Sequence, residues 1–258
     1  MTTIIPIPAF RDNYIWAVHD GRSAAVVDPG DAAPVFAWLT QSGMTLRAII
    51  ATHHHADHVG GVTALCERYD VPVFGPARET IPRRTHALGD GDRIEVPGIG
   101  LPLAVFDIPG HTAGHIAFYA TGSDPLLFCG DTLFAAGCGR LFEGTPEQMW
   151  SSLGKLAQLA PATRVYCGHE YTLANLRFAE AVEPDNADVR ARTSRERARR
   201  DRGEPTLPST IGDELATNPF LRAGLTNVAA TATKRAGRPM NGAVDVFATL
   251  REWKNGFQ

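Results

Sequence analysis

The pattern of apolar and polar positions predicts alternating strands and helices up to about residue 172. Short apolar runs that indicate opening strands lie at residues 4–7, 14–18 and 24–27. A helix is expected over residues 33–41. A second helix is expected from Thr145-Pro146-Glu147-Gln148, a capping-box sequence with proline at the first helical position.

Four further apolar runs each lead into a polar segment, and in the last three of them the polar residue lies beside a glycine. The runs are residues 46–51, 104–108, 126–129 and 164–167, and the polar segments that follow them are 52–61, 109–111, 130–132 and 168–170. Each run has the composition of a buried strand. Because ligands of open α/β sheets bind beyond the strand ends, the repetition predicts one site assembled from four distant segments.

The segment after the first of these runs, THHHADHVGG at residues 52–61, carries the densest chemistry of the chain. Four imidazoles and one carboxylate fall within six positions, His53 to His58. Polar rings packed together in an interior lose hydration at a cost of several kcal/mol, so such a cluster has no packing use. Imidazole and carboxylate together suit zinc or a similar divalent metal ion. The segment therefore predicts a metal site.

From about residue 173 the composition changes. The predicted features are a helix over 173–182, an arginine-rich segment at 188–203, a break at 205–210 and a short terminal helix from Val244, with no strand pattern or internal repeat. Arg192, Arg195 and Arg199 alternate with Glu196 and Asp201, which favours a solvated helix face with local ion pairs. A nucleic-acid patch is the alternative, but interleaved aromatic residues are absent from this segment.

Composition limits the class without defining it. The 258 residues allow one large domain or a domain with an appendage, and 44% apolar with 21% charged residues is typical of a soluble globular protein. The net charge of -3 argues against general nucleic-acid binding. No apolar stretch approaches the roughly 18 residues of a membrane span, and Met1-Thr2-Thr3 lacks the basic start of a signal peptide.

The cysteines do not indicate a second metal site. Cys66, Cys129, Cys138 and Cys167 lack paired zinc spacing, and two of them lie in apolar strand segments. We expect reduced packing residues of a cytoplasmic protein. Cys138 differs from the other three in lying in a glycine-rich loop.

The motifs together resemble a known family. THHHADHVGG (52–61), PGHTAGH (109–115), FCGDT (128–132) and CGHEYT (167–172) resemble the metallo-β-lactamase superfamily. GCGRLFEG (137–144) and the terminal LREWK (250–254) are similar to its glyoxalase II (hydroxyacylglutathione hydrolase) branch, and the resemblance covers nearly the whole chain. It implies an α/β fold: a metallo-β-lactamase-like αββα sandwich over residues 1–172, with a smaller helical, glutathione-contacting domain over 173–258.

The resemblance also implies a set of metal ligands. One ion would be held by His53, His55 and His111, the second by Asp57, His58 and His169, and Asp131 would bridge the two. A carboxylate has two oxygens and can span cations about 3.5–4 Å apart, which supports the bridging position. His54 and His115 are expected not to be ligands, and Asp28 is expected to orient one by hydrogen bonding.

The implied activity is thioester hydrolysis, in which S-(2-hydroxyacyl)glutathione, chiefly S-D-lactoylglutathione, yields glutathione and D-lactate in the second step of methylglyoxal detoxification. Two divalent ions, zinc first with iron or manganese as alternatives, would lower the pKa of a bridging water towards about 7 and supply hydroxide. A thiolate leaving group, with a conjugate-acid pKa of about 8.5, needs no dedicated general acid. Asp57 and Asp131 are the expected catalytic residues, and a monomer is the default.

Glutathione carries carboxylates, so its site should present cations and hydrogen-bond donors. The family's tripeptide-binding positions correspond to Arg140, Phe142, Tyr171, Arg251 and Lys254. Arg251 and Lys254 stand three residues apart, on one helix face. Phe142 stands where some relatives have tyrosine, so one hydroxyl contact to the ligand would be missing.

Several other functions share the expected metal core. A glutathione persulfide dioxygenase, a lactonase, a β-lactamase and a tRNA-processing nuclease are alternatives, each with a different C-terminal pattern. A metal-stabilised binding module without turnover is an alternative from another class, and loss of folding on metal removal would favour it. The complete set of seven expected ligands favours an enzyme.

Overall fold

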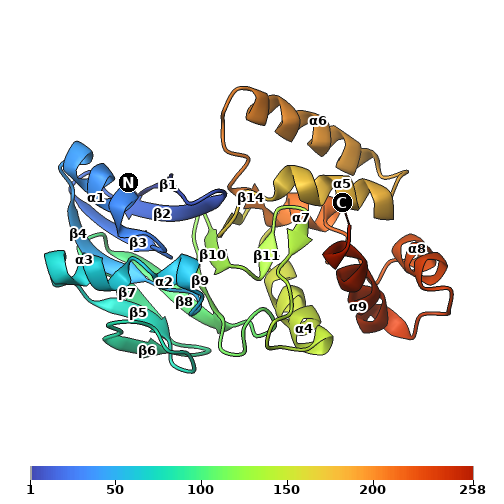
Figure 1. Ribbon diagram of the computed structural model, residues 1–258, viewed down its shortest axis with the longest axis horizontal. Coiled ribbons are helices and arrows are strands. Elements are labelled where there is room, and N and C mark those ends of the chain that lie inside the picture. The colour runs from blue at the N-terminus through green and yellow to red at the C-terminus, as the bar shows by residue number, and fades with distance from the viewer. Residues whose placement is uncertain (1, 258) are drawn as a thin grey trace.

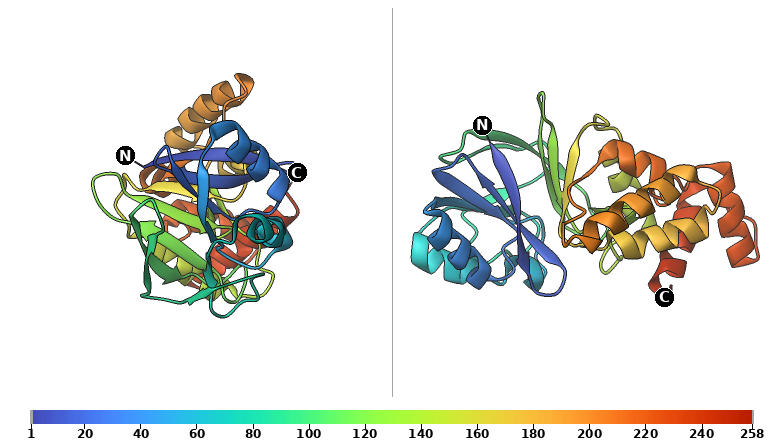
Figure 2. Two further views of the ribbon diagram at one scale, coloured as in Figure 1. Left: turned by 90° about the vertical axis from the view of Figure 1, so that its left-hand side faces the viewer. Right: turned by 90° about the horizontal axis from the view of Figure 1, so that it is seen from above.

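Two mixed β-sheets face one another, with helices on the outer side of each (Figure 1). The view from above in Figure 2 shows the sheets converging towards one end of the N-terminal half, while the C-terminal helices gather beyond the second sheet. The computed structural model describes residues 2–257. Met1 and Gln258, which end the predicted domains 1–172 and 173–258, lie outside the described residues. The predicted αββα sandwich is confirmed.

The first sheet has the order β1-β2-β3-β4-β5-β6. Its strands are β1 (Thr3–Ala9), β2 (Asn13–His19), β3 (Ser23–Val27), β4 (Thr45–Ile50), β5 (Val73–Pro76) and β6 (His86–Leu88). Strands β1, β2 and β3 pair antiparallel with one another, and the pairs β3–β4, β4–β5 and β5–β6 are parallel. Every residue of β3 is buried, because helices cover one face of the sheet and the second sheet covers the other.

Three helices belong to this half: α1 (Ala32–Ser42), α2 (Ala56–Val59) and α3 (Val62–Tyr69). Helix α1 begins at Asp31, whose carboxylate accepts from the amide of Ala33, and ends at Gly43 in the left-handed conformation with φ 68°. Val35 of α1 and Leu65 of α3 pack with the apolar residues of the first sheet in one hydrophobic cluster. The helix expected over residues 33–41 is thus confirmed.

The second sheet has the order β14-β13-β10-β9-β8-β7. Its strands are β7 (Arg93–Val96), β8 (Leu101–Asp107), β9 (Ile116–Ala120), β10 (Leu126–Gly130), β13 (Arg164–Cys167) and β14 (Ser209–Thr210). Strands β8 and β10 run in the same direction because both pair antiparallel with β9, and β13 is parallel to β10. The carboxyl ends of β8, β10 and β13 therefore meet at one edge, as the repeated motif pattern predicted.

The space between the sheets is filled by large apolar side chains. Trp16 packs edge-on against Tyr166 with ring centroids 4.9 Å apart, and its indole N–H donates to the carbonyl of Cys167 at 2.9 Å. The same cluster continues into the C-terminal helices through Phe178 and Phe247. The predicted division at residue 172 stays a prediction, and one continuous core crosses it.

The remaining helices are α4 (Pro146–Ala157), α5 (Thr172–Val182), α6 (Ala187–Asp201), α7 (Ile211–Thr217), α8 (Thr226–Ala236) and α9 (Gly242–Asn255), and a small hairpin is formed by β11 (Leu133–Phe134) and β12 (Gly137–Cys138). The capping box at Thr145 is present, and the terminal helix begins at Gly242 rather than Val244. The expectation of no strand beyond residue 173 is wrong, because β14 pairs with β13. Two residues are too few to produce a strand pattern in the sequence.

The arginine-rich segment forms α6, but its predicted solvated face is wrong for two residues. Arg192 is 2% exposed and Glu196 is 3% exposed. Arg195 and Arg199 do form the expected local ion pairs with Glu196. Arg192 instead pairs with Glu214 of α7, a partner too far along the chain to be predicted from local spacing.

Among residues 2–257, no helix combines the length and apolar character needed to cross a membrane.

The indole of Trp16 offers a test of how the two sheets are joined. Trp16→Phe keeps an aromatic ring but leaves the buried carbonyl of Cys167 without its donor, so we expect unfolding to become easier by about 1–2 kcal/mol. Denaturant unfolding measures this difference. Trp38→Phe is the matched control, since that ring is half-exposed and its N–H has no hydrogen-bond partner within residues 2–257. Equal losses in both variants would contradict the assigned role.

Candidate metal centre and substrate cleft

The ends of four strands bring all seven predicted ligands to one place. His53, His55, Asp57 and His58 follow β4, His111 follows β8, Asp131 follows β10 and His169 follows β13. Asp131 is the first residue after its strand, so its position is set directly by the sheet. The side chains of His53 and His58 are buried at the base of the site, while His55 and Asp57 face a cleft.

The nitrogen and oxygen atoms form two groups of potential metal ligands. One group is His53, His55 and His111, and the other is Asp57, His58 and His169, with the ligand atoms of each group within 4.8 Å of one another. These groups coincide with the two triads implied by the resemblance. Residues 2–257 hold two further groups, Asp28 with His53 and His58, and His54 with His55 and Glu143. His115 is in none of the four.

Asp131 lies between the two triads. Its Oδ2 is 3.5 Å from Nε2 of His111 and 3.3 Å from Nε2 of His169, and its Oδ1 is 3.4 Å from Nε2 of His58. The carboxylate therefore touches rings of both groups. This is the arrangement that a bridging ligand requires.

In His58, His111 and His169 the second ring nitrogen is held by a neighbouring oxygen. Nδ1 of His111 donates to the carbonyl of Arg140 at 2.8 Å, and Nδ1 of His169 contacts Oδ1 of Asp12 at 2.8 Å. Nδ1 of His58 lies 3.1 Å from Oδ2 of Asp28, which is the expected role of Asp28. Holding Nδ1 in this way leaves Nε2 directed at the centre of the site, as in metal-binding histidines.

The charges of the site follow from its burial. Desolvation lowers the pKa of His53 well below its ordinary value, so this ring is neutral. Burial alone would raise the pKa of Asp131, but His58 and His169 outweigh it and hold the pKa well below its usual range. Burial works to lower the pKa of His58, yet the carboxylates of Asp131 and Asp28 hold it well above the ordinary value. The ionised carboxylate of Asp131 thus attracts positive charge, whether a proton or a metal ion.

A metal ion fits these residues on a further observation. Nε2 of His58 and Oδ1 of Asp131 are buried and have no hydrogen-bond partner among the described residues. Buried polar atoms normally have a partner, because an unsatisfied group costs about 1–3 kcal/mol. Two such atoms facing one another in a His/Asp cluster are suited to divalent metal ions.

The glycine that precedes His169 is required by this crowding. A Cβ atom on Gly168 would lie 2.6 Å from Oδ1 of Asp131 and 2.6 Å from Cε1 of His58. Real Cβ atoms do not approach other heavy atoms so closely, so only glycine fits. Gly130, before Asp131, has φ +46°, a backbone conformation that glycine adopts without penalty.

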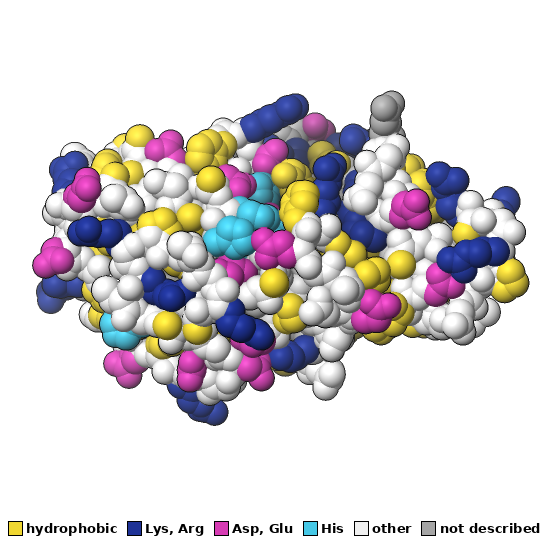
Figure 3. Space-filling view, turned by 60° about the horizontal axis from the view of Figure 1, so that its bottom comes forward, with side chains coloured by type: hydrophobic (Ala, Val, Ile, Leu, Met, Phe, Trp, Pro, Cys, Tyr) yellow, Lys and Arg dark blue, Asp and Glu magenta, His cyan; other side chains and the backbone are white. Residues whose placement is uncertain are grey.

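A cleft of about 530 Å³ opens beside the site. Its lining includes all five predicted substrate contacts, Arg140, Phe142, Tyr171, Arg251 and Lys254, together with His55, Asp57, His111, Asp131 and His169. Figure 3 shows histidine side chains at the centre of this face and a group of Lys and Arg side chains beside them. The cleft thus joins a floor of His and Asp side chains to a basic wall.

Arg251 and Lys254 of α9 also hold the cleft together. Arg251 is 6% exposed, and its guanidinium donates to the carbonyl of Cys138 at 2.7 Å. The ammonium of Lys254 donates to the carbonyl of Ala174 in α5 at 3.0 Å. Burial, and then the nearby Arg251, lower the pKa of Lys254 to about 8. The predicted common helix face is confirmed, and it also joins α9 to β12 and α5.

Two aromatic rings flank the histidines. Tyr171 stacks on His169 with ring centroids 4.7 Å apart and planes 4° apart. Phe142 is 63% exposed, and its ring lies edge-on to those of His55 and His111. An exposed ring beside predicted ligands is free to contact a bound molecule.

The sequence did not reveal several supporting residues. Asn13 donates to Oδ2 of Asp57 at 3.0 Å, and Glu79 lies 2.9 Å from Nδ1 of His54 while also accepting from Thr112 and from the amide of Gly114 at 3.0 Å. Asp12 and Asn13 lie near the start of the chain, outside the motifs that carried the family resemblance. Glu79 lies between β5 and β6 in no recognised motif. The cleft also includes Asn175 and Asn255.

Comparison with known proteins agrees with this geometry. The family profile described as "Metallo-beta-lactamase superfamily" matches residues 9–169, and that described as "Hydroxyacylglutathione hydrolase C-terminus" matches residues 170–257. A hydroxyacylglutathione hydrolase of Alkalilimnicola ehrlichii is 60% identical over 257 residues, which cover 99% of each chain.

Solved structures agree on the fold. The crystal structure of ETHE1 from Myxococcus xanthus is 23% identical, with a TM-score of 0.66 over 98% of this chain and 99% of that one. The crystal structure of TTHA1623 in a di-iron-bound form is 28% identical, with a TM-score of 0.60 over 84% of this chain and 100% of that one.

Two facing mixed sheets with His/Asp clusters at one edge define the metallo-β-lactamase superfamily, to which the profile over residues 9–169 also assigns the chain. The full-length identity and the C-terminal profile narrow the class further. The chain belongs to the hydroxyacylglutathione hydrolase family, and the resemblance found in the sequence is confirmed.

The position of His54 separates it from the rings at the centre. Its two nitrogens face the carboxylates of Glu79 and Glu143 at 2.9 and 3.3 Å. We therefore expect His54→Ala to keep the metal content of the wild type, whereas His55→Ala should lower it. Elemental analysis of the purified variants measures the stoichiometry. Loss of metal from His54→Ala would show that the cluster is divided differently.

Proposed function

We propose that this protein is a metal-dependent thioester hydrolase that cleaves S-(2-hydroxyacyl)glutathione, chiefly S-D-lactoylglutathione, to glutathione and a 2-hydroxy acid. The observation that carries the proposal is one cleft with a His/Asp floor at one end and the cations Arg140, Arg251 and Lys254 along its wall. A thioester of an anionic tripeptide needs both features. Relatives of the same family and of full length are named hydroxyacylglutathione hydrolases.

The proposed ligands are His53, His55 and His111 for one ion, Asp57, His58 and His169 for the other, and Asp131 for both. Zinc is the first choice for imidazole and carboxylate ligands, and iron or manganese can replace it. The di-iron form of the 28% identical neighbour supports a pair of ions. Bound divalent ions supply a water of lowered pKa and polarise a carbonyl oxygen.

The side chains of the protein set the geometry of the reaction. Asp131 remains ionised, and Asn13 fixes the orientation of Asp57 by donating to its Oδ2. Tyr171 keeps its proton because burial raises the pKa of the phenol, so it can donate a hydrogen bond to the substrate. Arg140, Arg251 and Lys254 bind the carboxylates of glutathione. The departing thiolate needs no protein acid, since its conjugate acid has a pKa of about 8.5.

We further propose residues 1–172 as the catalytic unit and 173–258 as the glutathione-contacting unit of a monomer. The four cysteines are unpaired and buried, which suits a reducing, cytoplasmic location.

The deciding experiment is hydrolysis of S-D-lactoylglutathione by the purified protein, with metal content measured on the same sample. We expect rapid loss of the thioester and about two metal ions per chain. Asp131→Ala should lower both quantities, because its carboxylate is shared by the two triads. A protein with two metals and no thioesterase activity would refute the substrate, and oxygen consumption with glutathione persulfide would indicate a dioxygenase.

The pKa of Lys254 predicts a pH dependence of substrate binding. A pKa of about 8 means that the ammonium is charged below pH 8 and loses its charge as the pH rises above it. We expect KM for S-D-lactoylglutathione to rise several-fold between pH 7 and about pH 9, with a smaller change in kcat.

Lys254→Met is the control, because it keeps much of the side-chain volume without the charge. The KM of this variant should be high at every pH and should lack the rise that Lys254 causes. Any change in KM that comes from titration of the substrate's own amine would appear in both proteins. A parallel rise in both would exclude Lys254 as its origin.

A further inference from the structure

The β11–β12 hairpin (residues 133–138) links the two parts of the cleft. Phe134 and Cys138 line the cleft, and the hairpin lies between Asp131 and Arg140 in the chain. The amide of Gly139 donates to the carbonyl of Thr132 at 3.1 Å. At the far end, the carbonyl of Arg140 accepts from Nδ1 of His111 at 2.8 Å. A displaced hairpin would therefore move the cleft wall and reorient a histidine of the site.

The hairpin does not hold its own shape. It has only two paired positions, and Ala136 in its turn has φ +54°, which is unfavourable for a residue with a Cβ atom. Its backbone is bound instead by side chains of the C-terminal helices. Oε2 of Glu214 accepts from the amide of Ala136 at 2.7 Å. The other bonds are donated to hairpin carbonyls: by Asn175 Nδ2 to Ala135 (3.0 Å), by Asn218 Nδ2 to Phe134 (3.2 Å) and Gly137 (2.8 Å), and by Arg251 to Cys138 (2.7 Å).

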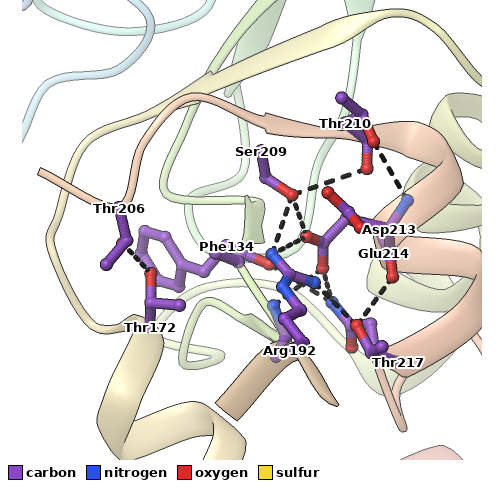
Figure 4. A network of polar contacts seen from close by, with 12 residues as sticks. Phe134, Thr172, Arg192, Thr206, Ser209, Thr210, Asp213, Glu214 and Thr217 are labelled. Atoms are coloured by element: carbon purple, nitrogen blue, oxygen red, sulfur yellow. Dashed lines mark hydrogen bonds and ion pairs between the residues drawn. The ribbon is translucent and has the colours of Figure 1, made fainter. Parts of the chain in front are cut away.

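Among these groups, Glu214 has a distinctive environment. It is fully buried, and both of its oxygens face donors only. Oε1 accepts from Nη2 of Arg192 at 2.8 Å and from the hydroxyl of Ser209. Oε2 accepts from the amide of Ala136 and from Nδ2 of Asn218 at 2.7 and 2.9 Å. Figure 4 shows Arg192 and Glu214 facing one another between Ser209 and Thr217.

A carboxylate suits this environment and an amide does not. A glutamine at position 214 has one acceptor oxygen and one NH2 group, so the NH2 would face donors on one side. The charged guanidinium of Arg192 would attract the amide oxygen and leave the NH2 against the amide of Ala136. The charge of Arg192 would thus determine which way a glutamine at position 214 points.

We propose that the buried Arg192–Glu214 pair is a positioning device, which fixes the β11–β12 hairpin for substrate binding by holding the amide of Ala136. Glu214 acts through the hairpin, and neither member of the pair lines the cleft. Buried ion pairs often add no net stability over apolar residues of similar volume, so a positional role is a reason for this one. The inference rests on the proposed function, since substrate binding is one of its readouts.

Two measurements on Glu214→Gln test the proposal. Hydrogen–deuterium exchange of residues 133–140 should become faster, and KM for S-D-lactoylglutathione should rise by about fivefold to tenfold at saturating metal, with kcat changed less. Thr217→Val is the matched control. It removes the hydroxyl that Nη1 of Arg192 contacts at 2.6 Å but leaves every contact to the hairpin. It should lower the melting temperature without changing exchange of the hairpin or KM.

A second pair of variants separates position from stability and does not depend on Glu214→Gln folding. Arg192→Met with Glu214→Gln should restore KM to near the wild-type value, because the amide oxygen can then turn to Ala136. Arg192→Met with Glu214→Leu is equally uncharged but provides no acceptor, so its KM should stay high and its hairpin should exchange faster.

The outcomes are distinguishable. Equal KM values in the two double variants would overturn the proposal. It would also be overturned if Glu214→Gln changed hairpin exchange without changing KM, or changed KM without changing hairpin exchange. Exchange does not depend on the substrate. A wild-type protein that leaves the thioester intact would therefore refute the proposed function alone, whereas unchanged hairpin exchange in Glu214→Gln and in the Leu double variant would refute the positioning alone.

Discussion

An ionised carboxylate, Asp131, lies buried among imidazole rings near the middle of the molecule. Such a charge is costly unless positive charge surrounds it, and the rings of His58, His111 and His169 all lie within 3.5 Å of its oxygens. Those rings come from three segments that follow three different strands. The pairing around β10 brings the ends of β8 and β13 beside Asp131, and β4 of the first sheet leads to His58 from the other side.

The loops are held in turn by residues farther out. Asp28 holds both His58 and Thr52, and Asp12 holds His169. Glu170, directly after His169, accepts from the amide of Thr206 at 2.8 Å and so fixes the segment that leads into β14. These outer residues are polar and partly or fully buried, so they hold the ligand-bearing segments by hydrogen bonds.

The C-terminal helices contribute to the cleft in two ways. They supply the basic wall, and they supply the side chains that complete the backbone hydrogen bonds of the β11–β12 hairpin. Arg251 belongs to both groups, because it lines the cleft and donates to the carbonyl of Cys138. The core that passes from the sheets through Phe178 to Phe247 makes these helices part of the same packed unit.

Much of the fold and of the candidate site could be predicted because the signals are local. The run from His53 to His58 reveals metal chemistry since its residues have no packing use, and strand ends beside glycine reveal where the ligands gather. The capping box at Thr145 is likewise contained within four residues. The substrate contacts depended on the family resemblance, since Arg251 and Lys254 by themselves are indistinguishable from a solvated pair.

The sequence by itself thus determined the kind of site and the order of the elements that build it. Only the tertiary structure decided that Arg192 is buried against Glu214, that Glu79 lies against His54, and that Ser209 and Thr210 complete the second sheet. The physical reason is common to all three. A buried polar group is stable only beside a complementary partner, and these partners lie 22, 25 and about 45 residues away, where no local periodicity records them.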